Sequence, residues 1–214
     1  MSNTAKPTIL WQQMDQAITS WVKAALASPE LTAMLGLQAV VVIVSLWAFS
    51  HPTGASWFTL SSSSLIKRFQ PWRWVTYSFF HANLPHLTLN MISLYHGGYY
   101  LLFERGLGYT ALIYTLGVAV PAFLWCIFVS KSSEIREIVG ASTGVFALFG
   151  ACAFVRPDLK LIVGFIAPID INTGMALIMV GSLYLHAYGH WKRVWHLGHF
   201  LGGAVGFYAA KFLG

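Results

Sequence analysis

Six apolar segments long enough to cross a lipid bilayer dominate this chain of 214 residues. A helix of about 20 apolar residues crosses the roughly 30 Å hydrocarbon core of a bilayer. The sequence therefore predicts an all-α membrane protein with six transmembrane helices. We place the segments at residues 33–49, 84–102, 109–129, 139–155, 173–189 and 194–213.

The composition agrees with a chain that is surrounded mostly by lipid. Hydrophobic residues make up 57% of the chain and charged residues 9%, whereas a soluble domain carries about 25% charged residues. The net charge of +6 fits contact with anionic lipid headgroups, and there is no nucleic-acid-binding motif. We expect a multi-pass protein of the plasma (bacterial inner) membrane, although the lysines and arginines divide too evenly to orient it.

The chain divides into residues 1–32 and a membrane domain of residues 33–214. Apolar residues recur at helical spacing in the first part, for example at Leu10, Met14 and Ile18. This spacing predicts an amphipathic helix at the membrane surface, and a loosely ordered tail is the alternative. There is no signal-peptide pattern at the start of the chain.

Two connections are too long to be simple turns. Residues 50–83 include Trp72 and Arg73, and aromatic residues beside a cation are typical of a loop that is half embedded in the membrane interface. Residues 156–172 contain the apolar run Leu161 to Ile166, which is too short to span. We expect this second connection to dip into the membrane.

Polar side chains on three of the predicted spans are candidates for a catalytic site. Ser142 lies at the start of the fourth span and His199 in the sixth, and polar groups at membrane depth usually face a cavity or one another. His86 and Asn90 are four residues apart, so they share a helix face and can donate hydrogen bonds to an oxyanion. The simpler alternatives are a helix-capping role for Ser142 and interhelical hydrogen bonds for His86 and Asn90.

Glycine spacing predicts how Ser142 and His199 meet. Gly198, Gly202 and Gly206 repeat every four residues, as do Gly140 and Gly144, and this pattern lets membrane helices approach closely. All seven acidic residues fall in tails, loops or span ends, which favours a Ser/His dyad over a triad with a buried carboxylate. We expect Phe146, one turn after Ser142, to stack on the imidazole. The acidic residues are Asp15, Glu30, Glu104, Glu134, Glu137, Asp158 and Asp170.

These residues resemble the rhomboid family of intramembrane serine proteases, and the resemblance covers Trp72 to Gly206. It implies a six-helix rhomboid-like bundle with a membrane-embedded first loop and no cofactor. Four features agree in order and spacing: Trp72-Arg73 in the first loop, His81, His86 and Asn90 in the H-x4-H-x3-N pattern, Gly140-x-Ser142 opening the fourth span, and a histidine followed by glycines in the sixth.

The resemblance implies a role for each matching residue. Ser142 is the nucleophile, His199 the general base, and His86, Asn90 and the Ser142 backbone N–H stabilise the oxyanion. Phe146 takes the aromatic position beside the catalytic imidazole. The implied substrates are membrane proteins with a single transmembrane segment or several, which are cut in or beside that segment.

The chain departs from the family pattern at two places. Thr143 replaces the glycine that usually follows the serine, so we expect a narrower cleft or a slower reaction. His196 lies three residues before His199 and is an alternative base, but glycines three and seven residues later favour His199. Thr143 also leaves open the alternative that this protein is a catalytically inactive member of the family, which binds transmembrane segments without cutting them. Glu104 and Gly108 resemble a structural cluster of the family and are not assigned to catalysis.

A metal or haem site is the main alternative from another class. His186 and His190 are four residues apart and near His196 in the sequence. No cysteine or carboxylate completes a known metal motif, so we expect no metal. Transport is disfavoured because no charged residue lies at the centre of a span.

Overall fold

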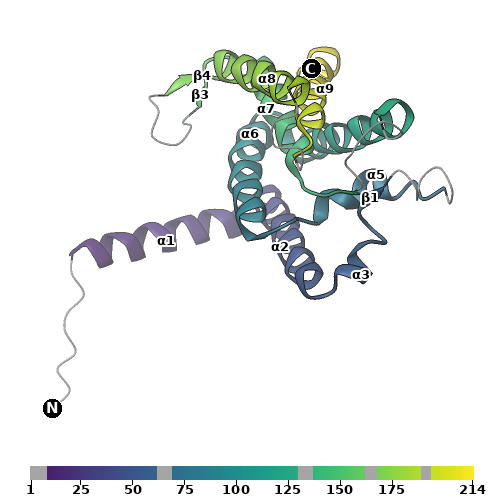
Figure 1. Ribbon diagram of the computed structural model, residues 1–214. Helices are drawn as coiled ribbons and strands as arrows, with labels where there is room; N and C mark the ends of the chain where they lie inside the picture. Colours follow the sequence, from purple (N-terminus) through teal and green to yellow (C-terminus); the bar gives the residue numbers. More distant parts are fainter. Residues whose placement is uncertain (1–8, 62–68, 130–136, 162–167, 189–193) are drawn as a thin grey trace.

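The computed structural model describes residues 9–61, 69–129, 137–161, 168–188 and 194–214 and is mainly helical (Figure 1). Two short antiparallel strand pairs join β1 (Leu60–Ser61) to β2 (Glu137–Ile138), and β3 (Lys160–Leu161) to β4 (Ile169–Asp170). The helices are α1 (Ile9–Ala27), α2 (Pro29–Ser50), α3 (Pro52–Ala55), α5 (Arg73–Thr76), α6 (Leu84–Leu124), α7 (Ser142–Val155), α8 (Ile171–Ala187) and α9 (His196–Leu213), with a 3-10 turn η1 (Tyr77–Phe79) and a π-helical turn η2 (Trp125–Val129).

The helical conformation is interrupted at Ser28, between α1 and α2. The Ser28 hydroxyl accepts a hydrogen bond from the backbone N–H of Leu31, and Pro29 occupies the first position of α2. Both features favour a helix start, because they suit the unpaired N–H groups of the first turn. Helix α2 therefore includes residues 29–32, which we predicted to belong to the amphipathic segment. Figure 1 shows α1 extending away from the other helices.

The second and third predicted spans form one element, α6, with a break at Gly106. This glycine has φ +81° and ψ 171°, a conformation that residues with a Cβ rarely adopt. The chain changes direction at this point, so α6 consists of two helical arms at residues 84–105 and 107–124. The six or so connecting residues that the sequence suggests are reduced to this single break.

Two helices of the described chain are long and apolar enough to cross a membrane. They are Pro29–Ser50 and Leu84–Phe128, which combines α6 with most of η2, and each contains an 18-residue stretch with a mean hydropathy of 2.1. Helices α7 and α8 are apolar but shorter, with 14 and 17 residues. Large apolar side chains are exposed on the outer faces, as expected where lipid replaces water as the solvent. They include Val40, Ile43, Leu89, Ile92, Leu177 and Val180.

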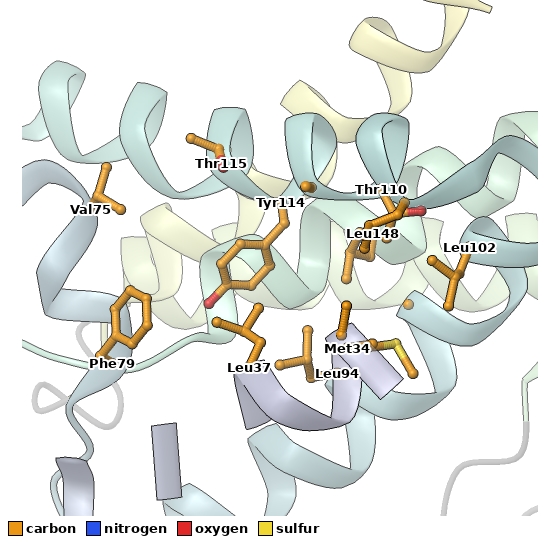
Figure 2. Close-up of a pocket in the computed structure, with 14 residues that line it drawn as sticks. Met34, Leu37, Val75, Phe79, Leu94, Leu102, Thr110, Tyr114, Thr115 and Leu148 are labelled. Carbon is orange, nitrogen blue, oxygen red and sulfur yellow. The ribbon is translucent and has the colours of Figure 1, made fainter. Parts of the chain in front are cut away.

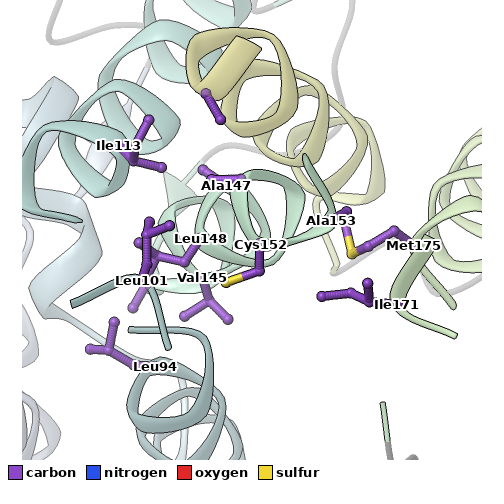
Figure 3. Packing of buried hydrophobic residues seen from close by; sticks show 13 residues of the cluster. Leu94, Leu101, Ile113, Val145, Ala147, Leu148, Cys152, Ala153, Ile171 and Met175 are labelled. Carbon is purple, nitrogen blue, oxygen red and sulfur yellow. The ribbon is translucent and has the colours of Figure 1, made fainter. Parts of the chain in front are cut away.

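Helix α7 forms the centre of the core. Its buried side chains pack against α6 on one side and against α8 and α9 on the other (Figure 3). Nine of its 14 residues are buried, so α7 has almost no free face. A helix enclosed in this way gives a rigid support to the residue at its start. The packed residues include Leu94 and Leu101 of α6, Val145, Leu148 and Cys152 of α7, and Ile171 and Met175 of α8.

Glycines of α9 bring its backbone into contact with α7. A Cβ at Gly202 would lie 2.3 Å from the Thr143 carbonyl oxygen, and one at Gly206 would lie 1.9 Å from that of Ala147. The predicted close approach of these two helices is confirmed at these two glycines. The other three glycines contact different groups, so their expected part in this helix pair is wrong: Gly198, Gly140 and Gly144 face Trp195, His86 and Tyr114.

Alanine at Gly206 should therefore destabilise the protein. The added methyl group overlaps the Ala147 carbonyl, and overpacking of this kind costs about 1–3 kcal/mol. We expect the unfolding temperature in detergent to fall by several degrees. Gly181→Ala is the matched control, because nothing lies within 4 Å of its added Cβ and alanine favours helices. Equal unfolding temperatures for the two variants would contradict the close contact.

The connection at residues 50–83 folds around Arg73. The Arg73 side chain is only 4% exposed, and its guanidinium donates to Gln70 Oε1 and to the carbonyl oxygens of Ser56 and Thr59. Trp72 beside it is 46% exposed. The cation thus organises the loop from inside while the neighbouring indole faces outward. Of the second long connection, at residues 156–172, residues 162–167 lie outside the described structure, and they include all of the apolar run except Leu161.

A charged cluster marks the other end of α7. Arg156 caps α7 and forms ion pairs with Glu104 of α6 and with Asp158. Hydrogen bonding to Arg156 holds the pKa of the Asp158 carboxyl below its usual range. Nearby, the hydrogen bond from Lys160 lowers the pKa of Asp170. Glu104 therefore has a structural partner, which agrees with its exclusion from the predicted catalytic residues.

Candidate active site

Ser142 and His199 lie 57 positions apart in the sequence, and the fold brings their side chains together. His199 Nε2 lies 2.9 Å from Ser142 Oγ, within hydrogen-bond distance. Both side chains are partly exposed, so the pair is accessible from outside the core. Ser142 is the first residue of α7, and the capping position belongs to Ala141. The capping alternative for Ser142 therefore does not hold.

Phe146 lies beside the imidazole. Its ring centroid is 4.7 Å from that of His199, with the two planes inclined by 31°. Ser142 and Phe146 are one helical turn apart, so a single face of α7 contacts the His199 ring at two points. The predicted stacking of Phe146 on this imidazole is confirmed.

His196 occupies the first position of α9, one turn before His199. It is 6% exposed, and its ring stands edge-on to that of His199 at 6.1 Å between centroids. The observed hydrogen bond to Ser142 comes from His199. His196 is thus a buried neighbour of the Ser142–His199 pair.

His86 lies over the backbone that leads into Ser142. Gly140 has φ +122°, and a Cβ there would lie 2.6 Å from Cε1 of the His86 ring. Only glycine allows this approach, so the glycine two residues before Ser142 makes room for an imidazole. Asn90 is buried one turn further along α6, where its amide donates to the His86 carbonyl oxygen.

The start of α7 presents backbone donors on the same side. The first N–H groups of a helix have no partner within the helix, and the capping residue Ala141 supplies no side-chain hydrogen bond in the described structure. The positive end of the helix dipole adds to the potential that favours negative charge there. A developing oxyanion near Ser142 would meet these donors.

Comparison with models of known protein families shows which family this chain belongs to. A model described as the Rhomboid domain matches residues 68–214, more than half of the chain. This chain belongs to the rhomboid family. The human protein named Rhomboid-related protein 3 is 36% identical over 84 residues, which are 39% of this chain and 20% of that protein, and the mouse protein of the same name matches equally. The matched region thus spans about a fifth of the length of these curated relatives.

A hydrogen-bonded bridge centred on His81 joins α2 to the rhomboid domain, and the sequence predicted no role for this histidine. The Ser45 hydroxyl donates to the Phe79 carbonyl, so Ser45 Oγ accepts from His81 Nδ1 at 3.0 Å. His81 Nε2 is then free to accept from the Ala141 N–H at 3.3 Å. This order of donors fixes the histidine tautomer and ties α2 to the residue before Ser142.

The first long connection holds residues 137–141, which lead into Ser142. Leu60 pairs with Ile138 in the β1–β2 ladder, and the Gly140 N–H donates to the Tyr77 carbonyl at 3.1 Å. Together with the His81 bridge, these contacts fix residues 137–141 from β1, η1 and the loop that follows η1. The H-x4-H-x3-N pattern could have pointed to His81, but its distant partners are not visible in the sequence.

The apolar cavity shown in Figure 2 is separate from this site. It measures about 180 Å³ and lies between α2, α6 and the first connection. Its lining includes Phe79, Tyr114 and Leu148, but not Ser142, His86 or His199. Among the residues with a defined position, no three His, Cys, Asp or Glu side chains form a metal-binding group. His190 lies outside those residues.

Proposed function

We propose that this protein is an intramembrane serine endopeptidase that uses a Ser142–His199 dyad. The observation that carries the proposal is the 2.9 Å contact between Ser142 Oγ and His199 Nε2 on two apolar helices. A serine and a base within hydrogen-bond reach form the minimal unit of an activated hydroxyl nucleophile. Membership of the rhomboid family and the six apolar segments of the sequence support a substrate that is held in the bilayer.

The proposed reaction runs through an acyl-enzyme. Neutral His199 accepts the Ser142 proton at Nε2, and the serine oxygen attacks the scissile carbonyl carbon. His199 then gives the proton to the leaving amine. Water, deprotonated by His199, releases the carboxylate product and restores Ser142. Stacking on Phe146 keeps the imidazole in place through both proton transfers.

The oxyanion of each tetrahedral intermediate would face His86, Asn90 and the Ser142 backbone N–H. Support for His86 comes from its ring lying against Gly140 and from its partial exposure. Asn90 is less accessible, with one amide hydrogen already given to the His86 carbonyl, so we assign it the smaller share of the stabilisation. Each donor of this kind is worth about 2.7–4 kcal/mol of transition-state stabilisation.

The length of α7 supports a site below the membrane surface. Fourteen residues make a helix about 21 Å long, roughly 10 Å shorter than the hydrocarbon core. The charged cluster at Arg156 would lie at one surface, which leaves Ser142 at the other end of α7 beneath the opposite surface. In this arrangement the two arms of α6, together with α2, α7, α8 and α9, form the six-helix multi-pass domain.

A substrate transmembrane helix must unwind locally before it is cut. An intact helix keeps each carbonyl in its own hydrogen bonds, whereas glycine and proline weaken those bonds. We therefore expect a reporter with Gly-Pro near the cut site to be cleaved about tenfold faster than an all-leucine reporter. The measurement is fragment formation by the protein in liposomes. Equal rates for the two reporters would contradict the unwinding step.

The same assay separates the protease from an inactive member that only binds transmembrane segments. Reporter binding without fragment formation by the wild-type protein, under all substrate compositions tested, would support the inactive alternative. Fragments that appear in the wild type and are absent with Ser142→Ala would support the protease.

A further inference from the structure

Thr143, the residue after Ser142, takes part in a buried chain of hydroxyl groups. Its Oγ1 lies 2.7 Å from the Tyr77 hydroxyl, and that hydroxyl donates to the Val118 carbonyl oxygen at 3.1 Å. A tyrosine hydroxyl has one hydrogen to give. Because Tyr77 gives it to Val118, Thr143 is the donor in the first bond. The chain therefore runs from Thr143 through Tyr77 to the backbone of α6.

Both side chains lie in the packed interior. Thr143 is 1% exposed and Tyr77 is fully buried, so neither projects into a cleft. The expectation that Thr143 narrows the cleft does not hold, because its side chain turns toward η1 and α6. The close approach to α9 is kept from the other side, where Gly202 meets the Thr143 backbone.

The first turn of α7 is thus held on two sides. The Thr143 backbone rests against Gly202, three residues after His199, and the Thr143 side chain is fixed to Tyr77. A shift or rotation of α7 at this residue would carry Ser142 Oγ away from His199 Nε2. Misplacement of reacting atoms by about 1 Å can reduce a rate by about 100-fold.

We propose that the Thr143–Tyr77 hydroxyl pair is a positioning device for the nucleophile, which sets the placement of Ser142 relative to His199. The inference rests on the proposed dyad and adds two residues that act through Ser142. Thr143 then replaces the conformational freedom of a glycine with a specific tether. Thr143 and Tyr77 are positioning residues, because neither touches the reacting atoms.

The test uses the full chain in liposomes and four variants. Thr143→Val keeps the branched shape without the hydroxyl, Thr143→Ser keeps the hydroxyl, Tyr77→Phe removes its partner, and the double variant combines the first and third. The readouts are the rate at which a fluorophosphonate labels Ser142, kcat and KM for the reporter, and the unfolding temperature. Rates are expressed per folded molecule.

We expect labelling and kcat to fall about tenfold in Thr143→Val and in Tyr77→Phe, with KM changed less than about twofold. Thr143→Ser should stay within about twofold of the wild type. The double variant should be no slower than the worse single variant, because both remove the same bond.

The inference is overturned by wild-type labelling in folded Thr143→Val, by equal losses in Thr143→Ser and Thr143→Val, or by multiplying losses in the double variant. It is also overturned if the rates per folded molecule show no loss and only the amount of folded protein falls. A wild-type protein that is not labelled, or labelling that survives in Ser142→Ala, would instead reject the proposed function and this inference with it.

Discussion

Alanine in place of Ser142 is expected to reduce cleavage of a transmembrane reporter by about 10⁴-fold or more. The hydroxyl oxygen forms the acyl-enzyme bond. Once the hydroxyl is removed, His199, which lies 2.9 Å from it in the wild type, has no proton to accept. In serine hydrolases, loss of the nucleophile leaves only the residual rate that the oxyanion site and substrate binding provide. Folding should be unaffected, because Ser142 does not cap α7.

The rate of fragment formation in liposomes is the measurement for this prediction. Ser20→Ala is the matched control, since it removes an exposed hydroxyl that donates to the Ala17 carbonyl within α1. We expect the control to cleave at the wild-type rate. A Ser142→Ala variant that keeps more than about a tenth of the activity would reject Ser142 as the nucleophile.

Replacement of each histidine of α9 in turn should reduce activity by very different amounts. His199→Gln removes the ring that contacts Ser142 and stacks on Phe146, so we expect a loss of about 10⁴-fold in kcat. His196→Gln alters a buried neighbour of that ring and should stay within about tenfold of the wild type. The contrast assigns the base directly.

Unfolding temperatures of both histidine variants provide the control, because His196 is the more buried of the two residues. Activity per folded molecule is the quantity to compare. A larger loss with His196→Gln than with His199→Gln would transfer the role of base to His196 and would require a different arrangement of α9.

Local patterns in the sequence were enough to predict the main helices and the central contact. Apolar runs located α2, α7, α8 and α9, because lipid-facing and core-facing positions are both apolar. Glycines at Gly202 and Gly206 predicted the approach of α9 to α7, since small residues at a spacing of four leave one helix face open. The contact of His199 with Ser142 follows from that approach.

Contacts between distant polar residues could not be predicted in the same way. The bridge from Ser45 through His81 to Ala141 and the bond between Tyr77 and Thr143 join residues 36 to 66 positions apart. A single histidine, serine or tyrosine has no periodicity that reveals its partner. The sequence placed a connection of several residues between the second and third spans, whereas the structure has a break at Gly106 alone, because a glycine at φ +81° looks the same in sequence as a glycine in a short loop.

Covalent labelling of the wild-type protein in liposomes by a fluorophosphonate, followed by peptide mapping in a mass spectrometer, shows whether Ser142 is the nucleophile. The proposed dyad predicts one adduct, on Ser142, whose formation stops reporter cleavage and is lost in His199→Gln. Continued cleavage with Ser142 fully modified, or an inactivating adduct on another residue, would contradict it.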